Sequence, residues 1–295
     1  MSASVPVPAV LPPLRLVCLS HAGGSTLLYR RWAQRLPGGV EILALELPGH
    51  GARRALPPHT EWPALLDTLL AELDGRLDAE VPFAVFGHSM GALVGFELIH
   101  ALRARHGLEP IWFGASASVA PAHRKHETHW LDCTHEAMVD KLRELGGTPS
   151  ALLEDREFID FVLPLLRADF HLCGTYPSSY PRPAAVWRDA AVNPAAVNVR
   201  RGVAREPLAC PIAVFTGRDD HTTACVENVA AWRDETRNTC TLHGFEGGHF
   251  YLDGAPDPVM ACVATSLAGA LAQPVRAAPA SQPEAALSKG EAWIH

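Results

Sequence analysis

The sequence predicts an α/β domain in which helices flank a mostly parallel central sheet and a helical lid is inserted. Short apolar runs alternate with longer segments of helical periodicity from Leu14 onward. A Gly-x-Ser-x-Gly motif stands between one such run and one helical segment. About 90 residues separate two consecutive runs late in the chain, far more than most α/β connections need, so an inserted subdomain is expected there.

Six apolar runs are expected to form the strands. They are nearly continuous in apolar character, which is typical of strands covered on both faces. The runs are residues 14–20, 40–47, 83–86, 111–115, 212–215 and 241–245. Between them the periodicity predicts helices at residues 28–36, 62–77, 90–105, 226–235 and 258–271.

The domain organisation follows from the same pattern. Residues 1–13 are expected to be an N-terminal extension and residues 14–272 the α/β domain, with the lid at about 121–210. The lid is expected to begin with helical segments at 136–145 and 155–173. A proline-rich stretch that should form loops follows at 177–207. The tail at 273–295 is rich in Ala and Pro and is expected to be disordered.

Composition excludes several functions. The 32 acidic and 25 basic side chains give a net charge of -7, which argues against a nucleic-acid partner. No run of 18 apolar residues occurs and no basic residue precedes Arg15, so we expect neither a membrane span nor a secretion signal. Seven cysteines without a C-x-x-C pair suggest free thiols in the cytoplasm. Neither a cofactor nor a metal is expected, although His123, His126 and His129 are three apart.

The nucleophile is expected at Ser89. The motif Gly87-His88-Ser89-Met90-Gly91 directly follows the run 83–86 and opens the helix that follows. This order of strand, motif and helix is that of a nucleophile elbow, a strained turn that raises the serine above the sheet. The flanking glycines are required because a Cβ at Gly87 or Gly91 would clash with the neighbouring backbone.

The acid and the base are expected later in the chain. Asp219 and Asp220 come after the run 212–215, and His249 stands in a Gly-Gly-His loop after the last run. Open α/β sheets place their sites at such strand ends. We favour Asp220 because it lies far enough beyond the strand to turn back toward His249. Asp219 is expected to cap the next helix or to face solvent.

Two backbone N–H groups should stabilise the oxyanion of the tetrahedral intermediate. One belongs to Met90, which follows the nucleophile. The other is assigned to Ala22, in a glycine-rich loop at the end of the first strand. Of the remaining histidines, His88 is expected to be a packed neighbour of the nucleophile and His50 to belong to a structural turn.

Five motifs in order make the chain similar to a known family over about residues 14–272. They are His21-Ala22-Gly23-Gly24, Leu47-Pro48-Gly49-His50-Gly51, Gly87-His88-Ser89-Met90-Gly91-Ala92, Leu166-Arg167-Ala168-Asp169-Phe170 and Gly247-Gly248-His249-Phe250. The chain resembles the type II thioesterases that accompany nonribosomal peptide and polyketide synthases. The resemblance implies an α/β-hydrolase fold with a helical lid and a catalytic triad of Ser89, Asp220 and His249.

The resemblance also implies a substrate and a partner. Members remove stray acyl groups from the phosphopantetheine arms of acyl or peptidyl carrier proteins, so a carrier protein is the expected partner. Carrier proteins are typically acidic beside that arm, which calls for a local basic face on this acidic chain. The candidates are Arg30, Arg31, Arg200, Arg201 and Arg205. The chain departs from the family in having His221 where a proline commonly follows the acid, and in a longer stretch at 180–206.

Two other functions remain open on the residues alone. A small-molecule carboxylesterase or a free acyl-CoA hydrolase would use the same residues, because fold and triad fix the reaction class rather than the acyl donor. A non-catalytic hydrolase-like interaction protein is the second alternative. The presence of all three triad residue types and of both oxyanion elements argues against it.

Overall fold

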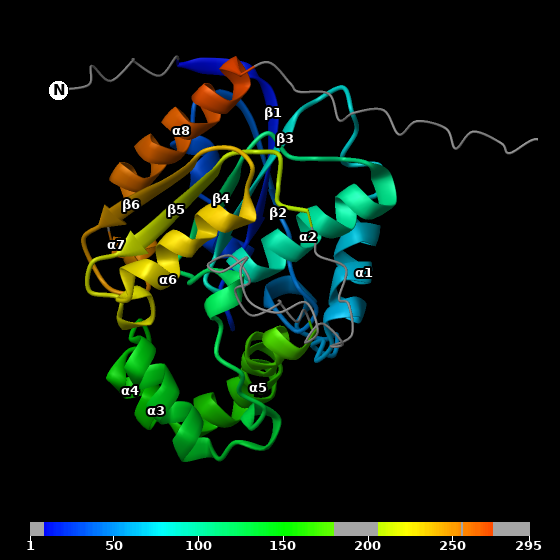
Figure 1. Cartoon of the computed structure of the whole chain (residues 1–295). Helices are drawn as coiled ribbons and strands as arrows, with labels where there is room; N and C mark the ends of the chain where they lie inside the picture. The colour runs from blue at the N-terminus through cyan, green and yellow to red at the C-terminus, as the bar shows by residue number, and fades with distance from the viewer. Residues whose placement is uncertain (1–8, 180–205, 255, 274–295) are drawn as a thin grey trace, which may run out of the picture.

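A parallel sheet forms the centre of the computed structural model, which describes residues 9–179, 206–254 and 256–273. Within these residues six strands pair in the order β2-β1-β3-β4-β5-β6, every neighbouring pair parallel (Figure 1). The strands are β1 (Val10–Leu19), β2 (Gly38–Ala44), β3 (Phe83–His88), β4 (Phe113–Ser116), β5 (Ile212–Gly217) and β6 (Cys240–Phe245). The sheet is therefore fully parallel over the described residues, in agreement with the predicted fold class.

Helices cover both faces of the sheet. One face carries α1 (Trp62–Leu73) and α2 (Met90–His106), and the other carries α8 (Pro256–Ala272). Alternate residues of β1 point to opposite sides: Val17 and Leu19 pack with α1 and α2, whereas Leu16 and Cys18 pack in the cluster that contains α8. From Leu16 to Leu19 this strand is buried on both faces, and every position there is apolar, so this part of the sequence shows no polar alternation.

Several elements differ from the sequence prediction. The helix expected at 28–36 is instead two 3-10 turns, η1 (Thr26–Tyr29) and η2 (Trp32–Gln34). The buried rings of Tyr29 and Trp32 are three residues apart, which suits the three-residue period of a 3-10 helix. The segment expected as one helix at 226–235 divides into α6 (Val226–Ala230) and η8 (Ala231–Glu235). Strand β1 begins at Val10, so part of the expected N-terminal extension belongs to the sheet, with an irregularity in the pairing between Val10 and Leu14.

The lid lies between β4 and β5. Its elements are η4 (Pro121–His123), η5 (Trp130–Asp132), α3 (His135–Leu145), α4 (Ser150–Glu154) and α5 (Arg156–Ser179). Figure 1 shows α3, α4 and part of α5 projecting beyond the ends of the strands. The lid packs around small apolar clusters of its own, but Leu172, Cys173 and Tyr176 at the far end of α5 join the main core. Helix α5 is therefore shared between the lid and the core.

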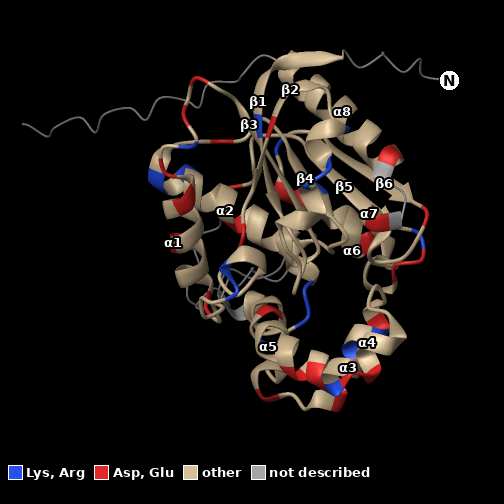
Figure 2. Cartoon of the chain, turned by 180° about the vertical axis from the view of Figure 1, so that it is seen from behind, with Lys and Arg blue, Asp and Glu red and all other residues tan. Residues whose placement is uncertain are grey.

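Short elements complete the fold, namely η3 (Gly51–Arg53), η7 (His221–Thr223) and α7 (Tyr251–Gly254). Charged residues gather on α3 and α4 and on the peripheral loops, whereas the strands carry few (Figure 2). In the part of the chain that the structure describes, no helix has the length and apolar character to cross a bilayer. The predictions for the stretch at 180–206, including Arg200, Arg201 and Arg205, fall almost entirely outside the described residues, as does nearly all of the tail at 273–295.

Candidate active site

The carboxyl ends of three strands bring the candidate residues together. Ser89 follows β3, Asp220 follows β5 and His249 follows β6. Because all strands run parallel, their carboxyl ends lie along one edge of the sheet, where α/β proteins form their sites. We call the loops that carry these three residues the catalytic edge.

Ser89 occupies a strained backbone conformation. Its φ of 56° and ψ of -114° lie in a region that residues with a side chain rarely adopt. The turn is possible because a Cβ at Gly87 would overlap the carbonyl of Gly91, and a Cβ at Gly91 would overlap that of Leu19. The N–H of Ser89 donates to the carbonyl of Ser116 at 2.7 Å, which fixes the turn to β4. Strand, turn and helix α2 thus have the order that the motif predicts.

Ser89, His249 and Asp220 form a continuous hydrogen-bonded relay. Ser89 Oγ lies 2.8 Å from His249 Nε2, and His249 Nδ1 lies 2.9 Å from Asp220 Oδ2. The carboxylate can only accept, so Nδ1 carries the proton and Nε2 is left as the acceptor for the serine hydroxyl. Asp220 is 3% exposed and His249 6%, while Ser89 is half-buried. The arrangement can remove a proton from a partly accessible hydroxyl.

The environment keeps Asp220 ionised. Burial alone would raise its pKa, but hydrogen bonds and charge attraction from His249, together with two hydrogen bonds from Thr222, outweigh burial and lower the pKa. Asp219 is exposed, in line with one of its two expected positions. The residue that caps η7 is Asp220, whose Oδ1 accepts a hydrogen bond from the N–H of Thr222. The sequence reading missed Thr222, although Asp-x-Thr is a known pattern for side-chain-capped turns.

Two further histidines lie beside His249 and stay uncharged. Burial, together with the positive charge that His249 and His50 can carry, lowers the pKa of His21 to about 4. Burial lowers the pKa of His88 well below 6.5, and His21 and His249 add to the effect. His88 Nδ1 lies 2.7 Å from Ser116 Oγ, which lies 2.5 Å from the hydroxyl of Tyr251. His88 is therefore a packed, hydrogen-bonded neighbour of the nucleophile.

Met90 and Ala22, the two proposed oxyanion donors, lie at the ends of neighbouring strands β3 and β1. Met90 is the first residue of α2, and the first N–H groups of a helix have no acceptor within it. Ala22 precedes Gly23, whose N–H donates to Asp169 Oδ2 at 2.7 Å. That bond fixes the loop around Ala22 from the side of the lid.

His50 forms a buried ion pair in addition to its place in a turn. Its Nε2 lies 2.8 Å from Asp169 Oδ2, and both side chains are 2% exposed. Its Nδ1 lies 3.0 Å from the carbonyl of Pro48. Both ring nitrogens thus face acceptors, which favours the imidazolium form. Burial alone would lower the pKa of His50, but the hydrogen bond and the charge of Asp169 raise it overall. Asp169 therefore joins lid helix α5 to two core loops.

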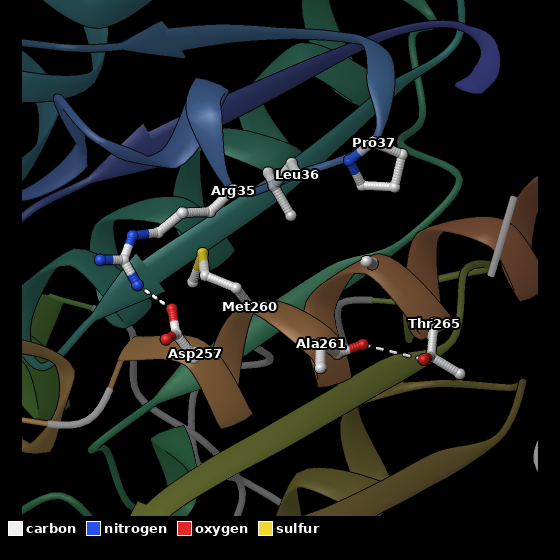
Figure 3. Close-up of a pocket in the computed structure, with 8 residues that line it drawn as sticks. Arg35, Leu36, Pro37, Asp257, Met260, Ala261 and Thr265 are labelled. Carbon is white, nitrogen blue, oxygen red and sulfur yellow. Dashed lines mark hydrogen bonds and ion pairs between the residues drawn. The ribbon is translucent and has the colours of Figure 1, made fainter. Parts of the chain in front are cut away.

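No residue of the site is arranged for a metal, since the described residues contain no group of three or more His, Cys, Asp or Glu that could hold an ion. An open depression of about 500 Å³ lies elsewhere, between the start of β2 and helix α8 (Figure 3). Its lining includes Leu36, Met260 and the ion pair of Arg35 with Asp257. None of the relay or oxyanion residues lines it.

Comparison with known proteins gives a family match over most of the chain. Residues 14–266 match the family model described as "Thioesterase domain". The thioesterase PikA5 of Streptomyces venezuelae is 34% identical over 252 residues, which are 83% of this chain and 78% of that protein.

Solved structures similar to this chain are also thioesterases. The RedJ thioesterase from the prodiginine biosynthetic pathway of Streptomyces coelicolor is 31% identical, with a TM-score of 0.70 and 90% of each chain covered. The type II thioesterase BorB from the borrelidin biosynthetic cluster is 32% identical, with a TM-score of 0.69, and the match covers 88% of this chain and 94% of that one.

Proposed function

Because the chain belongs to the thioesterase domain family, we propose that it is a serine thioesterase that removes acyl groups from the phosphopantetheine arms of carrier proteins. Ser89 is the nucleophile, His249 the general base and acid, and Asp220 the carboxylate that orients His249. The observation that carries this assignment is the unbroken relay from Ser89 Oγ through His249 to Asp220, with the serine on a strained elbow.

The first half of the reaction forms an acyl-enzyme. Ser89 Oγ attacks the thioester carbonyl carbon while His249 Nε2 takes the hydroxyl proton. The carbonyl oxygen becomes an oxyanion, which accepts hydrogen bonds from the backbone N–H groups of Met90 and Ala22. When the intermediate collapses, the carbon–sulfur bond breaks and His249 returns its proton to the sulfur. The free thiol of the arm leaves, and the acyl group stays on Ser89 as an ester.

The second half regenerates the serine. His249 Nε2 takes a proton from water as the water oxygen attacks the ester carbonyl, and the same two N–H groups donate hydrogen bonds to the new oxyanion. Collapse breaks the bond to Ser89 Oγ, which receives the proton from His249. Asp220 remains ionised throughout, because its lowered pKa favours the carboxylate beside the imidazolium.

A carrier protein as the acyl donor is supported by the relatives. PikA5 is named a thioesterase, and RedJ and BorB come from biosynthetic pathways for prodiginine and borrelidin. On this chain the exposed residues Arg30 and Arg31 come shortly after the loop that contains Ala22, between η1 and η2. They are the described candidates for contact with an acidic carrier near the site entrance.

Acyl release from loaded carrier proteins tests the proposal. Intact-mass measurements would follow the loss of the acyl group from a panel of acylated carriers, with acyl-CoA bearing the same group as the comparison substrate. We expect faster turnover of the carriers, and a loss of several orders of magnitude with Ser89→Ala at nearly unchanged Tm, because only a half-buried hydroxyl is removed.

Two results would contradict the proposal. Near wild-type turnover by a folded Ser89→Ala protein would remove Ser89 as the nucleophile. Equal or faster hydrolysis of acyl-CoA at matched concentrations would remove the carrier-bound acyl group as the preferred substrate.

A further inference from the structure

Thr222 donates hydrogen bonds to only one of the two oxygens of the Asp220 carboxylate. Its backbone N–H donates to Oδ1 at 2.9 Å, and its hydroxyl donates to the same oxygen at 2.7 Å. The other oxygen, Oδ2, accepts Nδ1–H of His249 at 2.9 Å. One oxygen is therefore held by Thr222, and the other is left for the imidazole.

The Thr222 hydroxyl also lies beside the proton that Asp220 and His249 share. Its oxygen is 3.2 Å from His249 Nδ1. Because the hydroxyl proton is donated to Asp220, the lone pairs of that oxygen are available to the Nδ1–H group as a second acceptor. A single hydroxyl thus contacts both the acid and the base.

The main chain of these loops is held without the Thr222 side chain. The N–H of Asp219 donates to the carbonyl of Gly247 at 3.0 Å, and that of Arg218 donates to Phe245 at 2.8 Å. A Cβ at Gly217 would overlap the carbonyl of Gly248, so the two loops approach as closely as backbones can. The χ2 angle of an Asp side chain, which sets the direction of the carboxylate oxygens, can still vary broadly when the backbone is fixed. The two donors of Thr222 act on that torsion.

We propose that Thr222 is a positioning residue for thioester hydrolysis, which keeps Oδ2 of Asp220 directed at His249 while the histidine gains and loses its proton. The inference rests on the proposed function, because it requires Asp220 and His249 to act together. Thr222 touches neither the acyl group nor the reacting atoms of Ser89. Its effect reaches the reaction through the carboxylate and the imidazole.

Substitutions at Thr222 separate a hydrogen bond from a packing contact. Thr222→Ser keeps the hydroxyl and should retain turnover within about twofold. Thr222→Val keeps the shape and loses the donor to a charged group, so kcat should fall about tenfold to hundredfold with KM nearly unchanged. Thr222→Ala should lie between them, because the exposed site leaves room for a water that can donate to Oδ1. A packing role predicts the opposite order, with Val nearest to wild type.

A double-mutant cycle adds a readout that a structural role would not change. In an Asp220→Asn background, Thr222→Val should reduce the residual turnover by less than about threefold, because the two residues act as one unit. Thr241→Val is the matched control, since Thr241 is an exposed threonine on β6 whose hydroxyl contacts His243. It should leave turnover unchanged.

The inference is overturned if Thr222→Val keeps wild-type kcat, or if it lowers turnover equally in the wild-type and Asp220→Asn backgrounds. Should the Val variant prove unstable, the ratio between the Ser and Ala variants decides instead, and equal turnover of those two would also overturn it. Failure of the proposed function is recognised separately, by a folded Ser89→Ala protein that keeps its activity.

Discussion

The catalytic edge and the lid are attached to the fold in different ways. On the catalytic edge the main chain does the positioning: the N–H of Ser89 donates to Ser116, and the N–H of Asp219 donates to Gly247. The lid is attached through side chains to the neighbouring loops that follow β1 and β2. The Asp169 carboxylate contacts both His50 and Gly23, and Leu166 packs beside Gly23.

Because of this difference, substitutions that affect the reaction and substitutions that affect the attachment of the lid should have distinct consequences. Substitutions at the ends of the relay should remove reactivity and leave the fold intact, because the backbone holds each loop. Substitutions at the joint formed by Asp169 should change how the lid is held, because side chains make that joint.

The largest effect is expected at the acid of the catalytic edge. Asp220→Asn should lower kcat by about 10³-fold to 10⁴-fold, because the amide favours the wrong tautomer of His249 and does not stabilise the imidazolium. Asp219→Asn is the matched control and should change kcat by less than about twofold. Steady-state kinetics of both variants on one acyl carrier would measure the ratio, and the reverse ranking would identify Asp219 as the acid.

A substitution at Asp169, where the lid is joined to the core, should lower both the stability of the fold and the rate of turnover. Asp169→Asn removes the buried counter-charge of His50, so the imidazolium either stays buried without a partner or loses its proton, and the fold should be destabilised by about 3 kcal/mol. Turnover should fall roughly tenfold, because Gly23 loses a charged acceptor beside Ala22. Denaturant unfolding and kinetics would measure the two effects.

The control for this variant lies on the same helix. Asp160→Asn in α5 removes a carboxylate that is 56% exposed and pairs with Arg156, so it should change stability by less than about 0.5 kcal/mol. Equal destabilisation by the two variants would show that the lid has no special joint at Asp169.

A smaller effect is expected at Arg30 and Arg31, the proposed carrier contacts. Paired charge reversal of Arg30 and Arg31 to Glu should raise KM for an acyl carrier protein roughly fivefold and flatten its salt dependence. Hydrolysis of a small acyl thioester should be unchanged. Reversal of Arg76 and Arg105, near the carboxyl ends of α1 and α2, is the control and should change neither substrate. Equal losses on both substrates would mean that Arg30 and Arg31 support the fold rather than docking.

A further prediction concerns the pH dependence of stability. His21 and His88 have lowered pKa values, so the unfolded chain binds more protons than the folded one as pH falls from 6.5 toward 4. Each should therefore destabilise the fold toward acid, by at most about 1.4 kcal/mol per pH unit. The pKa of His50 is raised, so its contribution is present below pH 6.5 and is lost as pH rises through its folded value.

Thermal unfolding across pH would separate the two regions. His21→Asn should make the acid-side slope of Tm shallower, and Asp169→Asn should do the same on the alkaline side. Identical slopes in wild type and both variants would show that these histidines titrate alike in the folded and unfolded states.

Site residues could be predicted from the sequence where a short local motif determines the position of the side chain. The elbow at Ser89 needs only adjacent residues, and parallel strands bring Asp220 and His249 to its edge, so these placements could be predicted. The ion pair of His50 could not, because its partner Asp169 is 119 residues away in a helix whose position depends on tertiary packing. Thr222 left a local signal, an Asp-x-Thr turn, but its distance to His249 depends on how the loops after β5 and β6 meet.

The insertion between β4 and β5 has a consequence for the route by which the molecule folds. Phe113 pairs with Ile212, 99 positions along the chain, whereas the pairs of β3 with β4 and of β5 with β6 are each 28 positions apart. Long-range pairings form late because loop closure must precede the contacts that reward it. Ser89 belongs to the segment before this seam, and Asp220 and His249 belong to the segment after it. Neither segment alone contains all three residues of the relay, so we expect thioester hydrolysis to begin only after β4 has paired with β5.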